Sequence, residues 1–505
     1  MTTWLTRATS PLGSFCHWIL NHRWRTHFLG LALIGYACFI GWHFEPVAAG
    51  SDCAGYLGSA KLLSEGKLTA TKRTIPEFHP ADPWPYVPLG YMGRADSTEL
   101  KPTYSVGLPL HYWAASKLAG WRWGPRGVSV LTAVAAVLLC YTLLREYGVK
   151  TPLAVLGSVA FAVSPVLLYV SFIPLSDAVA TVWGTAAVVF ALKARRAPRW
   201  SLASGAALGI AVLVRPSNLL FLPVLVVLLF PWRTLLGAGL GGLPVAFVEG
   251  IYNRTMYGSP FQTGYGSFAG SFRFEHLGPN LSTYLQNFPF VLPLLFPALW
   301  LIPALPWKKI PRELAALLLW LALFLTFYAF YENTSDAWWN LRFLLPAFPS
   351  AVVLCLLGAQ SLGERAVASG RRSWRRALPA VVLAVSLATS FYWSHKHRIT
   401  HLGRNQGSFA ETSAWARAHL PREALIGCMQ ISSSLYYYTD FPIFRWDGAT
   451  PDDYRELTQA LAQSHRPFYA ILYLSEEEEA MKHMPGSWKK VKAFHFFTIW
   501  QYAAQ

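Results

Sequence analysis

The stretch FLGLALIGYACFIGWHFEPVAAGSDCAGYLGSAKLLSEGKL, residues 28–68, decides how this chain folds. Its first part, residues 28–44, is apolar and close to the length of about 20 residues that a helix needs to cross a bilayer. We expect an uncleaved membrane-spanning helix there. The second part carries Asp52 and then places residues at helical spacing along one face: Tyr56, Ala60, Leu63 and Gly66. We therefore expect an amphipathic helix along the membrane surface that holds Asp52 at headgroup height. A carboxylate at a membrane face is costly unless it is used, so Asp52 is the first candidate for chemistry.

The composition excludes an ordinary soluble enzyme, because 53% of the 505 residues are hydrophobic and only 14% are charged. The net charge of +17 does not indicate a nucleic-acid partner, since the Lys and Arg residues fall in short clusters between apolar runs. Such clusters are typical of the cytoplasmic loops of membrane proteins. The six cysteines have neither a pairing rhythm nor metal-ligand spacing, which predicts free thiols.

The apolar runs predict an α-helical polytopic membrane protein with about eleven spans, within a range of ten to thirteen. The expected spans are 27–44, 125–144, 153–170, 177–193, 201–214, 218–231, 234–252, 287–305, 313–330, 343–361 and 377–393. With the basic N-terminus, residues 1–27, in the cytoplasm, every basic loop falls on the same side. This parity requires the apolar segment 104–120 to form an interfacial or re-entrant helix that does not cross.

The long irregular segments then gather on the external face, and long loops are usually functional. We expect a membrane module over residues 28–393, with interfacial helices in a first external loop at 45–124. Residues 394–505 are expected to form a small external α/β domain. Its predicted elements are helices at 408–420, 451–464 and 475–483, and strands at 424–429, 468–474 and within 491–502. The acidic run Glu476 to Glu479 is interpreted as the solvated start of a helix. No catalytic motif occurs in this domain, which predicts a structural or acceptor-recognition role.

Polar and aromatic residues recur at the external ends of the predicted helices. Two carboxylates there, Asp52 and Asp177, suit a general base and a partner that orients a hydroxyl or a metal. Several cations on the same face suit an anionic leaving group such as phosphate. The candidates are Asp52, Tyr56, Lys101, Tyr104, Asp177, Arg215, Asn253, Tyr257, Tyr265, Trp338, Trp339 and Arg342.

At this point the chain resembles the GT-C superfamily of membrane glycosyltransferases, which includes protein mannosyltransferases and lipid A aminoarabinose transferases. The resemblance covers roughly residues 28–393. It rests on the acidic residue of the first external loop, a Lys-Pro element at 101–102, and an acidic residue that opens a later helix. Three further runs carry it, LVRPSNLL at 213–220, NRTMYGSPFQTGY at 253–265 and WWNLRFLLPAFP at 338–349.

The resemblance implies transfer of a sugar from a polyprenyl-phosphate carrier to an acceptor hydroxyl on the external face, with inversion. Asp52 would be the general base, and Lys101, Arg342 and Arg215 would hold the donor phosphate. Asp177 would lie near the donor sugar or, with Asp52, hold a divalent metal; no other cofactor is expected. The remaining aromatic and amide candidates would line the substrate cavity. The acceptor would be a glycan, a lipid or a protein, and the expected location is the inner membrane of a bacterium, with the site and the C-terminal domain on the periplasmic or extracellular side.

Other readings of these residues stay open. Asp52 and Asp177 could cap their helices, Lys101 could be an interfacial side chain, and Arg342 could be an aromatic-belt anchor. The chain also departs from better-known members in two places. A single acidic residue precedes Cys53 where an acidic pair is usual, and Thr103 follows Lys-Pro. The main alternative function is a lipid or solute transporter or flippase, and a non-catalytic scaffold comes third.

Overall fold

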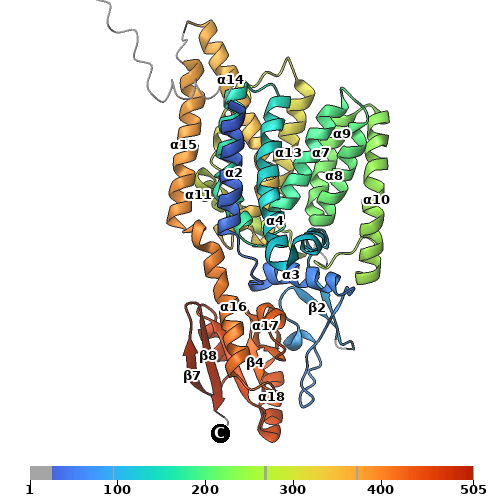
Figure 1. Ribbon diagram of the computed structural model, residues 1–505, viewed down its shortest axis with the longest axis vertical. Coiled ribbons are helices and arrows are strands. Elements are labelled where there is room, and N and C mark those ends of the chain that lie inside the picture. The colour runs from blue at the N-terminus through green and yellow to red at the C-terminus, as the bar shows by residue number, and fades with distance from the viewer. Residues whose placement is uncertain (1–24, 95, 267–269, 371–373, 504–505) are drawn as a thin grey trace, which may run out of the picture.

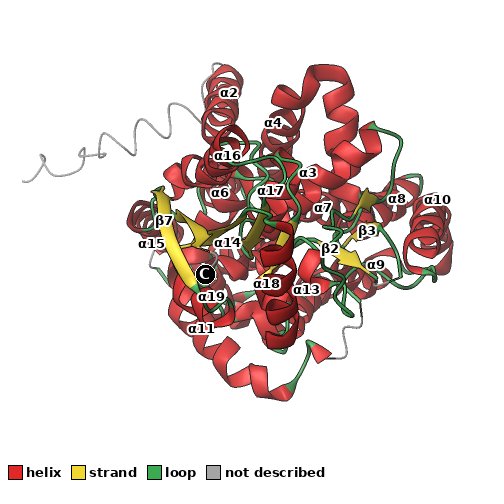
Figure 2. Cartoon of the chain, turned by 90° about the horizontal axis from the view of Figure 1, so that it is seen from below, coloured by secondary structure: helices red, strands yellow, loops and turns green. Residues whose placement is uncertain are grey.

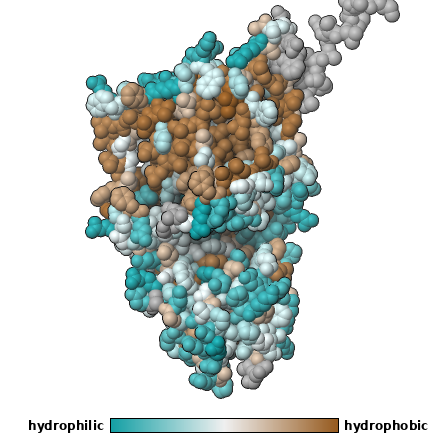
Figure 3. All heavy atoms as spheres, turned by 180° about the vertical axis from the view of Figure 1, so that it is seen from behind, coloured by the Kyte–Doolittle hydropathy of each residue, from teal (hydrophilic) through white to brown (hydrophobic). Residues whose placement is uncertain are grey.

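The computed structural model describes residues 25–94, 96–266, 270–370 and 374–503, and the predicted cytoplasmic N-terminus therefore lies almost wholly outside the described residues. The chain forms a helical part and a separate C-terminal domain below it (Figure 1). A short connecting layer, made by the first loop, lies between the two (Figure 1). Figure 2 views the molecule from below, and the strands lie on the side of the helices that carries the C-terminal domain. Space-filling atoms show a broad hydrophobic band over the helical part and a hydrophilic C-terminal domain (Figure 3). The predicted polytopic membrane architecture is confirmed.

The helical part consists of helices that run back and forth across this band. They are α2 (Arg25–His43), α4 (Gly107–Glu146), α5 (Thr151–Ala162), α6 (Pro165–Phe172), α7 (Asp177–Ala194), α8 (Trp200–Val214), η2 (Pro216–Leu220), α9 (Phe221–Leu229), α10 (Trp232–Tyr257), η4 (Phe274–His276), α11 (Leu277–Val291), α12 (Leu295–Trp300), η5 (Ile302–Ala304), α13 (Pro311–Ala329), η6 (Glu332–Thr334), η7 (Trp338–Ala347), α14 (Phe348–Ala368) and α15 (Trp374–Lys396). Here η denotes a 3₁₀ helix.

The predicted count of eleven spans is met only in part. Within the described residues, six helices are long and apolar enough to span a membrane, or seven when the bent pair α5 and α6 is one span. Three further predicted spans coincide with shorter apolar helices, His27–His43, Trp200–Val214 and Pro216–Leu229. The span expected at 287–305 is wrong as a continuous helix, because it is broken into α11, α12 and η5. Pro293 lies in the break between α11 and α12, and Pro303 lies just after α12, where each removes a helical hydrogen bond.

The segment 104–120 is continuous with a longer helix: from Gly107 it forms the first arm of α4, which bends at Gly120, where the backbone has a φ of 72°. A positive φ of this size is accessible to glycine at little cost, which makes Gly120 the natural corner. The expected interfacial or re-entrant position of the segment stays a prediction.

The two ends of the helical part separate the basic loops from the candidate residues. At one end, Lys150 pairs with Glu364 at 2.6 Å, and Arg196 pairs with Glu146 at 2.8 Å. These pairs join loops that the charge pattern assigned to a single side, so that part of the predicted topology is confirmed. The opposite end carries the first loop and the C-terminal domain (Figure 1), and we call it the domain face.

Close packing of α8 against α10 depends on glycine. A Cβ atom added to Gly205 would lie 1.7 Å from the carbonyl oxygen of Ala238, and one added to Gly241 would lie 2.0 Å from that of Leu202. Small residues let membrane helices approach to backbone contact in this way. The packing fixes α8, whose last residue is followed directly by Arg215.

The first loop forms α3 (Gly50–Ser64), η1 (Trp84–Tyr86) and a three-stranded antiparallel sheet of β1 (Ala70–Thr71), β3 (Glu99–Pro102) and β2 (Tyr91–Gly93), in that order. The predicted helix after Asp52 is therefore present. Its predicted amphipathic character is wrong, because every residue from Cys53 to Ala60 is buried. Helix α3 is covered by two other helices. Helix α4 packs on it from the helical part, and α17 (Ser432–Tyr438) packs on it from the C-terminal domain.

The C-terminal domain is a five-stranded mixed sheet with helices, as predicted. Its elements are η8 (Ile399–His401), α16 (Leu402–His419), β4 (Leu425–Cys428), α17, β5 (Ile443–Arg445), η9 (Trp446–Gly448), α18 (Pro451–Ser464), β6 (Phe468–Tyr473), α19 (Glu477–His483), β7 (Ser487–Ala493) and β8 (Phe497–Ala503). The strand order is β5-β4-β6-β8-β7, parallel among the first three strands and antiparallel among the last three. The sequence reasoning missed α17 and β5, which are short.

The acidic run that begins α19 is not uniformly solvated, which corrects the prediction for Glu476. That side chain is buried and accepts hydrogen bonds from the backbone N–H groups of Gln430 at 3.1 Å and Tyr473 at 2.9 Å. Burial raises the pKa of Glu476 to about 7, against the opposing effect of these hydrogen bonds. Glu476 thus fixes the turn that leads into α17.

The raised pKa of Glu476 predicts a pH-dependent C-terminal domain. The folded carboxyl group holds its proton more tightly than the unfolded one, so this stabilisation is complete below the ordinary Glu range and is lost as the pH rises to about 7. The protection factors of β4 and β6 amides, which are exchange rates corrected for the intrinsic acceleration of amide exchange with pH, should therefore fall over this interval. Glu476→Gln should flatten the dependence, whereas the exposed Glu478→Gln should leave it intact. An unchanged pH dependence in Glu476→Gln would contradict this explanation.

Candidate active site

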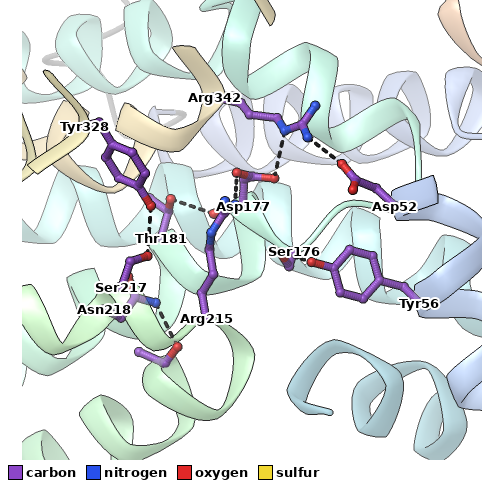
Figure 4. A network of polar contacts seen from close by, with 11 residues as sticks. Asp52, Tyr56, Ser176, Asp177, Thr181, Arg215, Ser217, Asn218, Tyr328 and Arg342 are labelled. Carbon is purple, nitrogen blue, oxygen red and sulfur yellow. Dashed lines mark hydrogen bonds and ion pairs between the residues drawn. The ribbon is translucent and has the colours of Figure 1, made fainter. Parts of the chain in front are cut away.

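Both predicted carboxylates and two of the predicted cations form one cluster on the domain face (Figure 4). Arg342, from η7, donates to the Asp52 carboxylate of α3, and its Nε atom lies 3.6 Å from Asp177 Oδ2. Arg215, which follows α8, donates to the other oxygen of Asp177 at the start of α7. The four side chains therefore make a continuous chain, Asp52 to Arg342 to Asp177 to Arg215, and we call it the charge cluster.

The two carboxylates of the charge cluster differ in their access to solvent. The side chain of Asp177 is 2% exposed and faces two guanidinium groups, whereas that of Asp52 is 29% exposed and faces one. A carboxylate with no exposed surface cannot reach an incoming hydroxyl without a rearrangement. Asp52 is therefore the more accessible of the two carboxylates, and Asp177 lies between the two arginines.

The helix-capping interpretation does not account for either carboxylate. Helix α3 begins at Gly50, so that Asp52 lies inside the first turn, and Ala49 occupies the cap position. Asp177 is the first residue of α7, after Ser176 at the cap, and neither helix has a side-chain cap hydrogen bond. The carboxylates bind arginine instead, although their positions at helix N-termini also favour negative charge.

The aromatic ring of Phe343 lies against the guanidinium groups of both arginines. The guanidinium carbon of Arg215 lies 4.9 Å from the centre of this ring, and that of Arg342 lies 5.1 Å from it. The predicted belt partners of Arg342, the two tryptophans before it, are replaced by this contact. The Nε–H of Arg342 is buried and has no hydrogen-bond partner among the described residues, because its distance of 3.6 Å from Asp177 is too long for a hydrogen bond. One donor of the cluster is thus unsatisfied.

Three of the predicted cavity residues surround Asp52. The hydroxyl of Tyr56 bonds Ser176 Oγ at 2.7 Å, that of Tyr104 bonds Ser51 Oγ at 2.7 Å, and the ring of Tyr265 lies 6.0 Å from that of Tyr104. Burial raises the pKa of Tyr265 to about 12, in spite of the nearby Arg215 charge. Burial and the Asp52 charge likewise raise the pKa of Tyr104 well above its usual range. These phenols are therefore neutral donors and not bases.

The other predicted residues lie outside the charge cluster. Lys101 Nζ donates to the carbonyl oxygen of Met256 at 2.5 Å, and the Tyr257 hydroxyl donates to that of Pro102 at 2.8 Å. Asn253 reaches the carbonyl oxygen of Pro260 at 3.3 Å. The first two contacts join strand β3 to the last turn of α10, and the third joins α10 to the loop that follows it. The phosphate role predicted for Lys101 would therefore require it to leave its carbonyl partner.

The two tryptophans of η7 make their contacts with residues outside the charge cluster. Trp338 packs against Tyr169, Trp393 and His397, while Trp339 is 43% exposed. Their part in a substrate cavity stays a prediction.

The predicted metal site at Asp52 and Asp177 does not fit a divalent cation. A hard cation requires several oxygen ligands whose charge is available to it, and each of these carboxylates already binds guanidinium. Among the residues that the structure describes, no group of three or more His, Cys, Asp or Glu side chains gathers to complete such a site. We derive no step through a metal.

The sequence reasoning missed residues that support the charge cluster. Ser217 accepts a hydrogen bond from the Tyr328 hydroxyl at 2.9 Å, and the Asn218 amide donates to the carbonyl oxygen of Ala211 at 2.8 Å (Figure 4). The sequence did contain a signal for Ser217 and Asn218, because both follow Arg215 in the quoted run LVRPSNLL. Tyr328 lies inside an apolar span and carried no sequence signal.

Residues 114–246 match the family model for dolichyl-phosphate-mannose-protein mannosyltransferase. This segment carries a protein mannosyltransferase-family domain. It includes two members of the charge cluster, Asp177 and Arg215. No curated protein sequence matches the chain.

Several solved structures share the fold. ArnT from Cupriavidus metallidurans bound to undecaprenyl phosphate is 15% identical, with a TM-score of 0.59 over 95% of this chain and 98% of that chain. The Archaeoglobus fulgidus oligosaccharyltransferase, tethered to an acceptor peptide, is 12% identical, with a TM-score of 0.55 over 96% of this chain and 75% of that chain. The arabinofuranosyltransferase AftD from Mycobacteria is 14% identical, with a TM-score of 0.53 over 94% of this chain and 41% of that chain.

The resemblance to GT-C glycosyltransferases that the sequence indicated is confirmed by the domain match and the shared fold. The expected enzyme class, a membrane glycosyltransferase with a lipid-phosphate-sugar donor, is confirmed as well.

Replacement of Asp177 should damage the structure of the charge cluster. Asp177→Asn would leave two buried guanidinium groups without their shared counter-ion, and breaking a buried ion pair from one side typically costs about 3–5 kcal/mol. We expect a markedly lower thermal midpoint for the detergent-solubilised variant. Asp96→Asn, which breaks an exposed pair with Arg94, is the matched control and should not move the midpoint. Equal midpoints for both variants would refute the anchoring role.

Proposed function

We propose that this protein transfers a sugar from a polyprenyl phosphate to an acceptor hydroxyl, with Asp52 as the general base. The observation that carries the proposal is the charge cluster, in which the more exposed carboxylate lies beside cations of the kind that bind phosphate. The acceptor hydroxyl would lose its proton to an Asp52 oxygen as its own oxygen attacks the anomeric carbon. The bond from that carbon to the phosphate oxygen would break, and the phosphate would leave with the electron pair. Attack from the side opposite the phosphate inverts the anomeric configuration.

The charges of the cluster suggest an order of events. Two carboxylates and two guanidinium groups balance one another, so no positive charge is in excess while Asp52 holds Arg342. A donor phosphate would compete with Asp52 for Arg342 and would also satisfy its free Nε–H. Asp52, released from the guanidinium, would then be a better proton acceptor. Donor binding would thus activate the base, and the acceptor would react second.

No dedicated general acid is required by this chemistry. A phosphate leaving group departs as a stable anion, so catalysis depends on a base on one side and on cations on the other. Arg342 and Arg215 supply the cations, with Lys101 as a further candidate if its bond to Met256 opens.

Molecules bound in the similar solved structures support the proposed substrate classes. ArnT binds undecaprenyl phosphate, and an archaeal oligosaccharyltransferase binds a dolichol-phosphate together with an inhibitory peptide. We propose a polyprenyl-phosphate sugar as the donor and a glycan, lipid or protein as the acceptor. The domain face would lie on the periplasmic or extracellular side of a bacterial inner membrane, since the opposite face carries the basic loops.

The base assignment predicts a specific loss in Asp52→Asn. The amide keeps the shape of the carboxylate but cannot accept the hydroxyl proton, and general-base catalysis typically contributes about 10²–10⁴-fold. We expect kcat to fall by about this factor, with release of polyprenyl phosphate from a panel of lipid-phosphate sugars as the readout. Glu65→Gln, just after the same helix, should retain full turnover. Near-normal turnover by a folded Asp52→Asn protein would eliminate Asp52 as the base.

The ordered mechanism predicts a different loss in Arg342→Lys. The substitution keeps one positive charge but removes the planar fork of donors, so binding of undecaprenyl phosphate should weaken. Equilibrium binding of that lipid to the purified protein measures the effect.

Because donor binding would activate the base, product-inhibition kinetics of the unmodified protein should also show that the donor binds first. Random binding order would contradict this mechanism.

A further inference from the structure

Helix α17 of the C-terminal domain lies against the start of α3, the helix that carries Asp52 (Figure 2). Its first three residues, Ser432, Ser433 and Ser434, are at most 1% exposed. A buried hydroxyl must find a hydrogen-bond partner or pay for its lost hydration. The partners that these serines find decide what α17 does.

All three serines bond to the backbone of the first loop. Ser434 Oγ donates to the carbonyl oxygen of Ala48 at 2.7 Å, and Ser433 Oγ donates to that of Gly50 at 2.9 Å. Ser432 Oγ accepts from the N–H of Leu89 at 3.1 Å. At the other end of α17, the Tyr438 hydroxyl accepts from the N–H of Ala48 at 2.9 Å. Ala48 is thereby held through both of its backbone polar groups.

This pattern differs from that of an ordinary helical serine. Ser413 in α16, also buried, donates to the carbonyl oxygen of Phe409 one turn back in its own helix, at 2.8 Å. Buried helical serines commonly bond in this local way. The hydroxyls of α17 are committed instead to a segment more than 300 residues earlier in the chain.

The segment that α17 holds determines where Asp52 points. Gly50 is the first residue of α3 and has a φ of 55°, so the chain turns sharply there before the helix begins. Asp52 follows two residues later, within the same turn. Any rotation of this turn would move the Asp52 carboxylate relative to Arg342, which is fixed on a different helix by Asp177 and Phe343.

We propose that α17 is the positioning element for Asp52, and that Ser433, Ser434 and Tyr438 aim this carboxylate by fixing Ala48 and Gly50. The proposal rests on the proposed function, since it gives the C-terminal domain a part in the same reaction. It assigns no contact with substrate to α17.

The C-terminal domain has other attachments, which allow these three contacts to be tested separately. Arg466 pairs with Glu77 at 2.9 Å, and Arg73 donates to the carbonyl oxygen of Thr439 at 2.7 Å. Arg73 also lies over the ring of Tyr436, 4.1 Å from its centre. Loss of the three hydroxyls should therefore loosen the start of α3 without detaching the domain.

The test is the triple variant Ser433→Ala, Ser434→Ala and Tyr438→Phe in the full chain. Cys53, directly after Asp52, is a buried thiol and reports on this turn without any need for turnover. We expect maleimide labelling of Cys53, followed by mass spectrometry of its peptide, to be at least about tenfold faster than in the unmodified protein. We expect kcat to fall by up to about 100-fold, as a displacement of about 1 Å can produce, with the KM for the lipid-phosphate sugar unchanged.

Ser413→Ala is the matched control, since it removes an equally buried hydroxyl from the same domain without touching the first loop. It should leave Cys53 labelling and kcat unchanged. Restoring Ser434 alone in the triple variant should recover part of both.

Two outcomes would overturn the proposal. One is unchanged Cys53 labelling in the triple variant, and the other is faster labelling with normal kcat. An unmodified protein that turns over no donor would count against the proposed function instead, while the labelling result would still decide whether α17 fixes this turn.

Discussion

The pairing of two carboxylates with two guanidinium groups at the edge of the membrane is the constraint on which the rest of the structure depends. Moving an unpaired ion out of water costs several kcal/mol, and removing one partner leaves the other in that condition. Asp177 and Arg215 are nearly inaccessible, so each must find its partner within the protein. The four members come from α3, α7, the end of α8 and η7, and the cluster therefore holds these four elements together. The charge cluster is therefore both the proposed chemical site and the contact that joins these four elements.

Much of this arrangement could be predicted from the sequence, because the pattern of charge and hydrophobicity is strong in a membrane protein. The positive-inside rule alone assigned the basic loops to one end and Asp52, Asp177, Arg215 and Arg342 to the other, and the ion pairs at both ends agree. The helices of the C-terminal domain were predicted closely where they are long and periodic, as in α18. These features are local, or they follow from a rule that applies to every loop.

The differences from the sequence predictions have a common physical cause. Segments distant in sequence pack over the residues concerned, and no local sequence pattern records such contacts. Helix α3 was expected to lie half-exposed on the membrane, but α17 covers the face that would meet water. Glu476 was expected to be solvated and is buried beneath the turn before α17. Lys101 was expected to hold phosphate; it bonds a carbonyl oxygen 155 residues away in this structure, a contact that no local pattern indicated, and its phosphate role stays a prediction. In each case a contact between distant segments decided the outcome, and periodicity carries no information on such contacts.

The two carboxylates also show how one pair of like residues can take different roles. The sequence places Asp52 and Asp177 in similar positions, since each stands near the start of a helix on the same face, although it made Asp52 the first candidate for chemistry. Their surroundings separate them, because Asp177 has two arginine partners and almost no exposed surface, whereas Asp52 has one partner and an open side. In the proposed mechanism, a phosphate that takes over Arg342 would leave Asp52 without an arginine partner, whereas Asp177 would keep Arg215. On this proposal the carboxylate with fewer bonds acts as the base, and the one with more bonds keeps the cations in place.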